Sequence, residues 1–286
     1  MTYGPKPWQQ TAWDWRAAGN FIGGGAGSGL IMFTALAGVE DATAAALLLA
    51  GLALIGLGLA CVWAELGRPL RALHVFFNPR TSWMTREAIA ATVLFPVGAL
   101  AALFAYAGVS GVAWLPAPVA LAFIYCQSRM LQAARGIPAW RAPRVVALLL
   151  ATSFAEGAAL FWLAQPWHGE GTPLLVLVFG ALLIARIALW YAYRLRLEGH
   201  VARRALAALD RAGVLLIGGT VVPLALLVAA LAAGGTTGTA LAALAGLAAA
   251  PAGAFVKFAL ITRAGFNQGF ALQRLPVRGQ APRGTR

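Results

Sequence analysis

The chain has 286 residues, of which 60% are hydrophobic and only 11% are charged, whereas a soluble domain is typically about 45–50% apolar and about 25% charged. This composition excludes an ordinary soluble protein and indicates a protein of the lipid bilayer. A formal net charge of +13 would be compatible with a nucleic-acid partner, but the basic residues are segregated as in a membrane protein, so we expect no nucleic acid.

A helix needs about 20 apolar residues to cross the hydrocarbon core. Eight apolar runs of this kind are separated by charge clusters or turn signals, and they lie near residues 17–38, 42–64, 87–108, 112–132, 145–165, 173–195, 213–234 and 238–262. The sequence therefore predicts an all-α integral membrane bundle of eight transmembrane helices. Residues 1–262 form this transmembrane domain, and residues 263–286 form a basic tail.

The first run contains a notch of five glycines between residues 23 and 29, and Asn20 is the polar residue nearest to it. Small residues at four-residue spacing let a neighbouring helix or a flat ligand approach the backbone closely. Helix packing is the favoured interpretation of this notch, and a flat ligand is the alternative.

The loop 65–87, between the second and third runs, carries four arginines and one histidine. Pro69 is suited to the first turn of a short helix. The leucines and phenylalanines that follow give this helix an apolar side, while Arg68, Arg71 and His74 remain polar. Such a segment is expected to lie in the membrane interface.

The third run begins after Asn78 and Pro79, which end the short helix. Ser82 or Thr85 is expected to cap it. Glu87 then falls in the first turn, where a carboxylate complements the positive end of the helix dipole.

Two charged residues lie deep inside later runs. Glu156 in the fifth run and Arg186 in the sixth are each about ten residues from the basic face, which is on the order of 15 Å. A charge at this depth usually pairs or lines a polar cavity. We therefore expect an ion pair between Glu156 and Arg186, with a structural role favoured and a role in proton movement as the alternative.

The charges also predict topology. With eight crossings, both termini and every second loop share one face, which holds 21 of the 22 Lys and Arg residues, Lys257 included, while the opposite loops hold none. The positive-inside rule makes this basic face cytoplasmic. Topology alone explains many of these charges, and docking of a partner is the alternative; the arginines assigned to docking are Arg80, Arg86, Arg141, Arg144, Arg203 and Arg204.

The chain is not expected to hold a redox cofactor or metal of its own. Cys61 and Cys126 stand singly in apolar context, so they form no iron–sulfur cluster motif. All three histidines fall in loops, which argues against a haem held between facing helices.

The loop motifs ELGRPLRA and NPRTSWMTRE resemble those of the dimethyl sulfoxide reductase membrane-anchor family, within the group that includes the membrane subunit of polysulfide reductase. The resemblance implies a non-catalytic, multi-pass subunit of the prokaryotic cytoplasmic membrane. It also implies docking, on the cytoplasmic face, to a ferredoxin-like iron–sulfur subunit joined to a molybdopterin catalytic subunit. Electron exchange with a quinone, menaquinone or ubiquinone, is expected near that face.

The family carries a histidine, tied to quinol, directly before L-G, and this chain has Glu65 there. A carboxylate can still exchange the proton that quinone chemistry requires, and His74 is a possible substitute. The residues expected to bind quinone are Asn20, Glu65, Arg68, Arg71, His74 and Trp83.

The N-terminal phrase YGPKPWQQTAWDWRAAGNF and the tail RAGFNQGFALQRLPVRG resemble the branch found with phenylacetyl-CoA:acceptor oxidoreductases. Phenylacetyl-CoA is therefore one expected substrate of the complex, and sulfite or a dimethyl sulfoxide-type compound is the alternative. Two other classes of function remain open at this point. A transporter or channel would use Glu156 and Arg186, and a passive membrane scaffold would have no quinone site.

Overall fold

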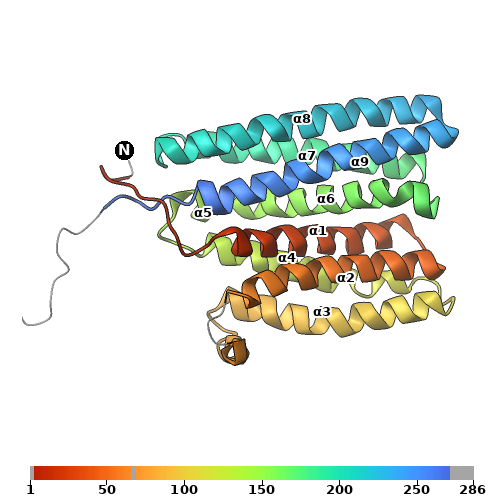
Figure 1. Ribbon diagram of the computed structural model, residues 1–286, viewed down its shortest axis with the longest axis horizontal. Coiled ribbons are helices and arrows are strands. Elements are labelled where there is room, and N and C mark those ends of the chain that lie inside the picture. Colours follow the sequence, from red (N-terminus) through yellow and green to blue (C-terminus); the bar gives the residue numbers. More distant parts are fainter. Residues whose placement is uncertain (1–2, 66–68, 271–286) are drawn as a thin grey trace, which may run out of the picture.

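The computed structural model describes residues 3–65 and 69–270 (Figure 1). Over these residues the chain is an all-α integral membrane bundle, as predicted. Its elements are α1 (Trp15–Ala37), α2 (Asp41–Trp63), η1 (Pro69–Phe77), α3 (Trp83–Tyr106), η2 (Val112–Trp114), α4 (Ala117–Gln132), α5 (Pro138–Arg141), α6 (Val145–His168), α7 (Pro173–Leu197), α8 (Arg203–Ala233), α9 (Gly235–Phe258) and the π-helical turn η3 (Ala259–Arg263).

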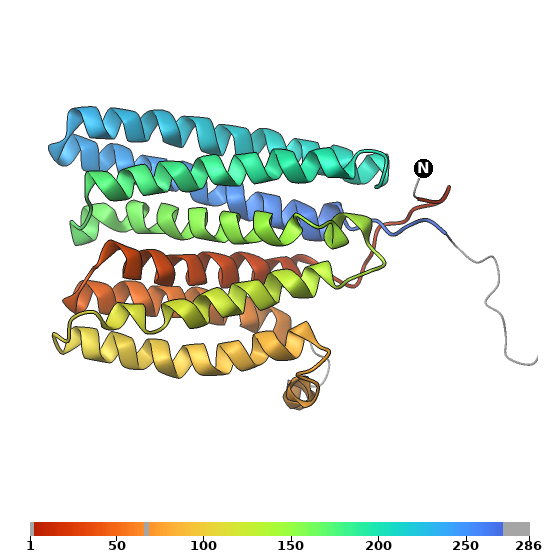
Figure 2. The ribbon, with the colours of Figure 1, turned by 180° about the vertical axis from the view of Figure 1, so that it is seen from behind.

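Seven of the described helices, α1, α2, α3, α6, α7, α8 and α9, are long and apolar enough to cross a membrane. The predicted fourth span is shorter than expected, because a turn at η2 and Pro116 delay the start of α4 until residue 117 and leave it 16 residues. This helix still runs beside the others, against α1 and α3 (Figure 2). The count of eight crossings thus remains a prediction that depends on α4.

The helices lie side by side in a bundle with α8 at one edge and α3 at the other (Figures 1 and 2). In its middle, α6 packs against α1 and α9 as well as against its neighbour in sequence, α7. Both described terminal segments lie at one end of the bundle, together with η1, α5 and the start of α8 (Figure 1). We call this end the basic end, because the loops that carry the arginines gather there.

The two terminal segments pair with each other at the basic end. The N–H of Gln10 donates to the Gly265 carbonyl at 2.8 Å, and the N–H of Asn267 donates to the Trp8 carbonyl at 3.0 Å. Next to this pairing, Asp14 caps α1, since its carboxylate accepts from the Arg16 N–H at 2.8 Å. The Arg16 guanidinium, which donates to the Asp14 carboxylate, lowers the pKa of Asp14.

The glycine notch of α1 is filled by other helices. A Cβ on Gly27 would collide with the carbonyl oxygen of Gly51 on α2, and a Cβ on Gly29 would collide with that of Ser153 on α6. The backbones of α1, α2 and α6 therefore approach closely because no side chains separate them. Helix packing, the favoured interpretation of the notch, agrees with these contacts.

Candidate functional site

Three polar side chains from three helices meet inside the bundle near its basic end. Glu87 of α3 accepts hydrogen bonds from the Asn20 amide of α1 at 3.2 Å and from the Gln127 amide of α4 at 3.1 Å. Gln127 also donates to the Asn20 backbone carbonyl at 3.1 Å. All three side chains are buried. We call Asn20, Glu87 and Gln127 the carboxyl cluster.

The local sequence explains how the carboxyl cluster forms. Of the two capping residues that the sequence offered, Ser82 caps α3 by accepting from the Thr85 N–H at 3.2 Å, and α3 therefore starts at Trp83. Glu87 then lies in the second turn, not in the first turn that the sequence predicted, and it faces the bundle. On α1, a Cβ at Gly24 would lie 2.6 Å from the Gln127 amide nitrogen, so the glycine makes room for that side chain.

The carboxyl cluster has unused hydrogen-bonding capacity. The side-chain oxygen of Asn20 is buried and has no partner among the described residues. Glu87 has only neutral amides as hydrogen-bond donors and forms no ion pair with a described residue. A buried carboxyl without a fixed cation can hold or release a proton without breaking a salt bridge.

Trp83 lies one turn before Glu87 and forms part of an aromatic and basic rim. The Arg86 and Arg129 guanidinium groups lie 4.2 Å and 4.9 Å from the centre of its ring. Tyr125 of α4 contacts the same ring edge-on, with the ring centres 5.8 Å apart. The predicted site residues Asn20 and Trp83 thus belong to the same end of α1 and α3.

Glu65 and His74 form no hydrogen bond or ion pair with Asn20 among the described residues. Glu65 follows α2, is partly exposed and interacts electrostatically with Arg16, one turn before Asn20 on α1. His74 is exposed on η1, which lies beyond α3, with α2 and α3 between η1 and α1 (Figure 1). Arg68 and the side chain of Arg71 lie outside the described residues.

The segment η1 is the short helix that the loop sequence predicted. The Thr85 hydroxyl donates to the Val75 carbonyl at 2.5 Å and ties η1 to the start of α3. His74 stacks on Phe77, with the ring centres 5.3 Å apart. This arrangement places His74 on the surface of the basic end rather than inside the bundle.

The predicted partner of Glu156 is corrected by the structure. Glu156 forms its ion pair with Lys257 of α9, with 2.5 Å between Nζ and Oε2 and both side chains 1% exposed. Lys257 also donates to the Ser153 hydroxyl at 3.1 Å. The reason is that α6 packs against α9, so the α9 face meets Glu156. Lys257 therefore does not belong to the basic face to which the sequence assigned it.

Arg186 donates hydrogen bonds to backbone carbonyls and a hydroxyl instead of to Glu156, and its buried Nε has no partner among the described residues. Its guanidinium donates to the carbonyl oxygens of Ala249 at 3.1 Å and Gly219 at 2.7 Å, and to the Thr220 hydroxyl at 3.3 Å. The side chain is fully buried. Arg186 thus links α7 to α8 and α9, and no hydrogen bond joins it to Glu156 among the described residues.

The arginines assigned to docking all lie at the basic end, but several also support local structure. Arg86 donates to the carbonyls of Pro79 and Arg80. Arg144 donates to the Ala192 carbonyl at 2.8 Å. The exposed side chains in this set are those of Arg80, Arg141, Arg144, Arg203 and Arg204. Among the described residues, no group of three or more His, Cys, Asp or Glu side chains is arranged to hold a metal.

Sequence reasoning missed Glu87, Gln127 and Lys257 as site residues. Glu87 was explained by the helix dipole, and Lys257 was counted with the surface charges. The available signal for Gln127 and Lys257 was their position several residues inside an apolar run, where a polar side chain needs a partner. Glu87 is the first residue of its run and gave no such signal.

Comparison with models of known protein families gives a match. The family of the DMSO reductase anchor subunit (DmsC) matches residues 16–187, which is more than half of the chain. No curated protein matches the chain.

Proposed function

The chain belongs to the DMSO reductase anchor subunit family, and on that premise we propose that it exchanges electrons with a membrane quinone at the basic end. As a member, it is a multi-pass membrane subunit that anchors a molybdopterin catalytic subunit and an iron–sulfur subunit. The role that we propose for this chain is to bind the quinone and to accept or donate the protons of the reaction.

The carboxyl cluster is the observation that carries this proposal. Quinol oxidation delivers electrons to the iron–sulfur subunit and releases a proton from each hydroxyl group. The free oxygen of Asn20 is an acceptor that suits a quinol hydroxyl. Glu87 lies next to it and forms no ion pair, so it is suited to take the proton as a general base. In the opposite direction, the same carboxyl donates the proton to a quinone.

The position of the cluster fits the same role. The clusters that supply or receive electrons belong to the iron–sulfur subunit, so the quinone has to bind near the surface where that subunit docks. Trp83, Arg86 and Arg129 form a rim close to Glu87 at the basic end. We propose that exposed arginines of this end, namely Arg80, Arg141 and Arg144, contact the partner.

The proposed orientation follows from the charges. The positive-inside rule places the basic end in the cytoplasm of a prokaryotic cell, and the complex would then act on a cytoplasmic substrate such as phenylacetyl-CoA. Crosslinking of the intact complex tests the docking part of this proposal. Crosslinks to the partner are expected on loops 64–82, 133–144 and 198–202; crosslinks found mainly on 107–116 and 169–172 would show that the opposite end docks.

The quinone site is tested by Glu87→Gln in the intact complex. This substitution keeps the side-chain shape and an acceptor for the amides, but it removes the titratable proton. Quinol turnover is expected to fall by about 10²-fold or more, the usual contribution of a general acid or base. Activity of the catalytic subunit with an artificial dye is expected to persist, because that reaction bypasses the quinone.

Two further variants make the test specific. Glu198→Gln removes an exposed carboxylate from the same end and is expected to leave quinol turnover unchanged. Glu65→Gln examines the carboxylate that the family motif indicates. If Glu65→Gln abolished quinol turnover while Glu87→Gln retained the wild-type rate, the site would lie at the end of α2 and not at the carboxyl cluster.

A further inference from the structure

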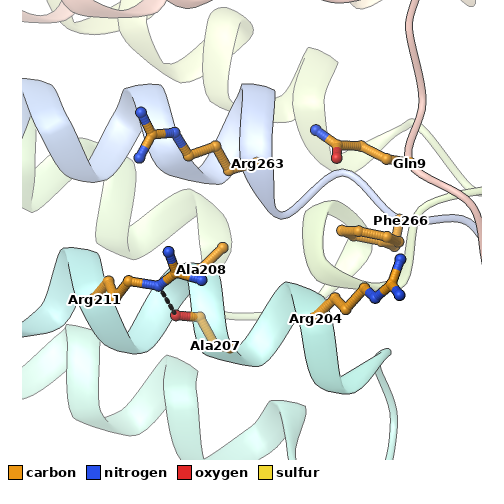
Figure 3. A pocket seen from close by; sticks show the side chains of 7 residues that line it. All are labelled: Gln9, Arg204, Ala207, Ala208, Arg211, Arg263 and Phe266. Carbon is orange, nitrogen blue, oxygen red and sulfur yellow. Dashed lines mark hydrogen bonds between the residues drawn. The ribbon is translucent and has the colours of Figure 1, made fainter.

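A second site lies at the basic end, away from the carboxyl cluster. A pocket of about 380 Å³ opens between the first turns of α8, the end of η3 and the paired terminal segments (Figure 3). Its lining residues are Gln9, Arg204, Ala207, Ala208, Arg211, Arg263 and Phe266. We call it the arginine pocket.

The arginine pocket concentrates positive charge without a compensating acid. Its lining includes three guanidinium groups and no Asp or Glu. Arg204 and Arg263 form no hydrogen bond or ion pair with a described residue, although Arg263 lies over the rings of Phe255 and Phe258, 5.4 Å from each ring centre. Arg211 uses only its Nε, which donates to the Ala207 carbonyl at 3.3 Å. Most guanidinium donors in the pocket are therefore free for a ligand.

The nearest carboxylate on the same helix is already occupied. Asp210 is adjacent to Arg211 in sequence, but it accepts from Arg194 of α7 at 2.5 Å and 3.0 Å. The beginning of α8 adds further positive potential, because it has no side-chain cap, no acidic residue in its first turn and two arginines there. An anion bound at this point would compensate both the arginines and the helix dipole.

The surface below the pocket is apolar and exposed. Helix α8 has 31 residues, or about 46 Å at 1.5 Å each, which exceeds the roughly 30 Å hydrocarbon core. Its first turns therefore lie at the level of the lipid headgroups. Residues at helical spacing from Arg211 continue the same face into the membrane, and Val214 and Leu215 are 69% and 51% exposed.

We propose that the arginine pocket binds a phosphate group, and that the apolar face below it favours an anionic phospholipid as the source. The phosphate would accept hydrogen bonds from Arg204, Arg211 and Arg263, since guanidinium groups match phosphate geometry and basic pockets between helices bind anionic headgroups. The acyl chains would lie along the exposed face of α8.

This site is independent of the proposed quinone chemistry. All three arginines lie beyond residue 187, outside the part of the chain that matches the anchor family. The pocket also uses none of the residues of the carboxyl cluster. Failure of one proposal therefore leaves the other standing.

The test uses the purified intact complex in a zwitterionic detergent. Native mass spectrometry counts bound phosphatidylglycerol during a titration, with phosphatidylcholine as the zwitterionic comparison of zero net charge and inorganic phosphate as the soluble probe. Arg211→Gln and Arg263→Gln are each expected to weaken phosphatidylglycerol binding about fivefold, and the double variant about 25-fold. Arg203→Gln is the matched control, because it removes an exposed charge from the first turn of α8, next to Arg204, but does not line the pocket.

The outcomes distinguish a lipid phosphate from a phosphate bound from solution, and both of these from docking of a partner protein at the pocket. Binding of phosphatidylglycerol that inorganic phosphate does not displace supports a lipid site, whereas equal binding of inorganic phosphate supports a phosphate site filled from solution. If the double variant bound phosphatidylglycerol as tightly as Arg203→Gln does, the proposal would be wrong. Loss of the partner subunits with unchanged lipid binding would overturn it as well, and would assign the pocket to protein docking. If the double variant does not assemble, the roughly fivefold weakening expected of each single variant decides the test.

Discussion

The buried ion pair between Glu156 and Lys257 gives the sharpest prediction for stability. Both side chains are 1% exposed and the charged atoms are 2.5 Å apart. Lys257→Met removes one charge and leaves Glu156 buried without its partner. Breaking such a pair costs about 3–5 kcal/mol, which corresponds to a fall in melting temperature of roughly 6–20 °C at about 2–4 °C per kcal/mol.

The double variant separates the ion pair from simple packing. Lys257→Met combined with Glu156→Gln removes both charges and leaves side chains of similar volume. The double variant is expected to melt above Lys257→Met alone, because replacing both partners of a buried pair is less harmful than stranding one. The measurement is thermal unfolding of the intact complex in mild detergent, followed by the loss of its size-exclusion peak.

A surface substitution provides the control for this experiment. Arg196→Met removes an exposed cation from the last turn of α7 and is expected to leave the melting temperature within about 1–2 °C of wild type. The reasoning would be refuted if Lys257→Met had the same melting temperature as the wild type. It would be refuted equally if the double variant were destabilised by the sum of the effects of Lys257→Met and Glu156→Gln measured singly, since that result means no coupling between the charges.

Three further predictions follow from close contacts. Gly29→Leu places a side chain against the Ser153 carbonyl of α6 and is expected to abolish accumulation of the complex in membranes, whereas Gly56→Ala, with 3.6 Å to the nearest atom, is expected to accumulate normally. Arg186→Met leaves carbonyls of α8 and α9 without their donor and is expected to lower the melting temperature by several degrees, at about 1–3 kcal/mol for each stranded group. Thr85→Val removes the hydrogen bond that holds η1; limited proteolysis should then cut the loop around η1 faster, and an unchanged rate would show that other contacts hold this segment.

Most of the fold could be predicted because bilayer physics constrains sequence strongly. Apolar length predicted the helices, the glycine notch predicted close packing of α1, and the loop motif predicted η1. The exact ends of helices were harder, because they depend on local turns. Pro116 shortens α4, and α8 starts ten residues before its apolar run, because a helix of 31 residues can extend beyond the roughly 30 Å hydrocarbon core.

The candidate site was less predictable, because it depends on the rotation of each helix about its axis. Asn20 was recognised from its position beside the glycine notch. Glu87 was not, since a carboxylate near the start of a helix is explained equally well by the helix dipole. Only the direction in which α3 faces α1 and α4 shows that Glu87 meets Asn20 and Gln127.

The partner of Glu156 illustrates the same limit and its physical origin. Glu156 and Arg186 lie at similar depth on helices that follow one another in sequence, so depth alone predicted their pairing. Depth gives only the position of a side chain along the membrane normal, however, and does not determine which helix the side chain faces. Because α6 packs against α9, Glu156 meets Lys257 and Arg186 is left to bind backbone carbonyls. An intramembrane charge therefore has to be tested against every charge at its depth, including those near the ends of distant spans.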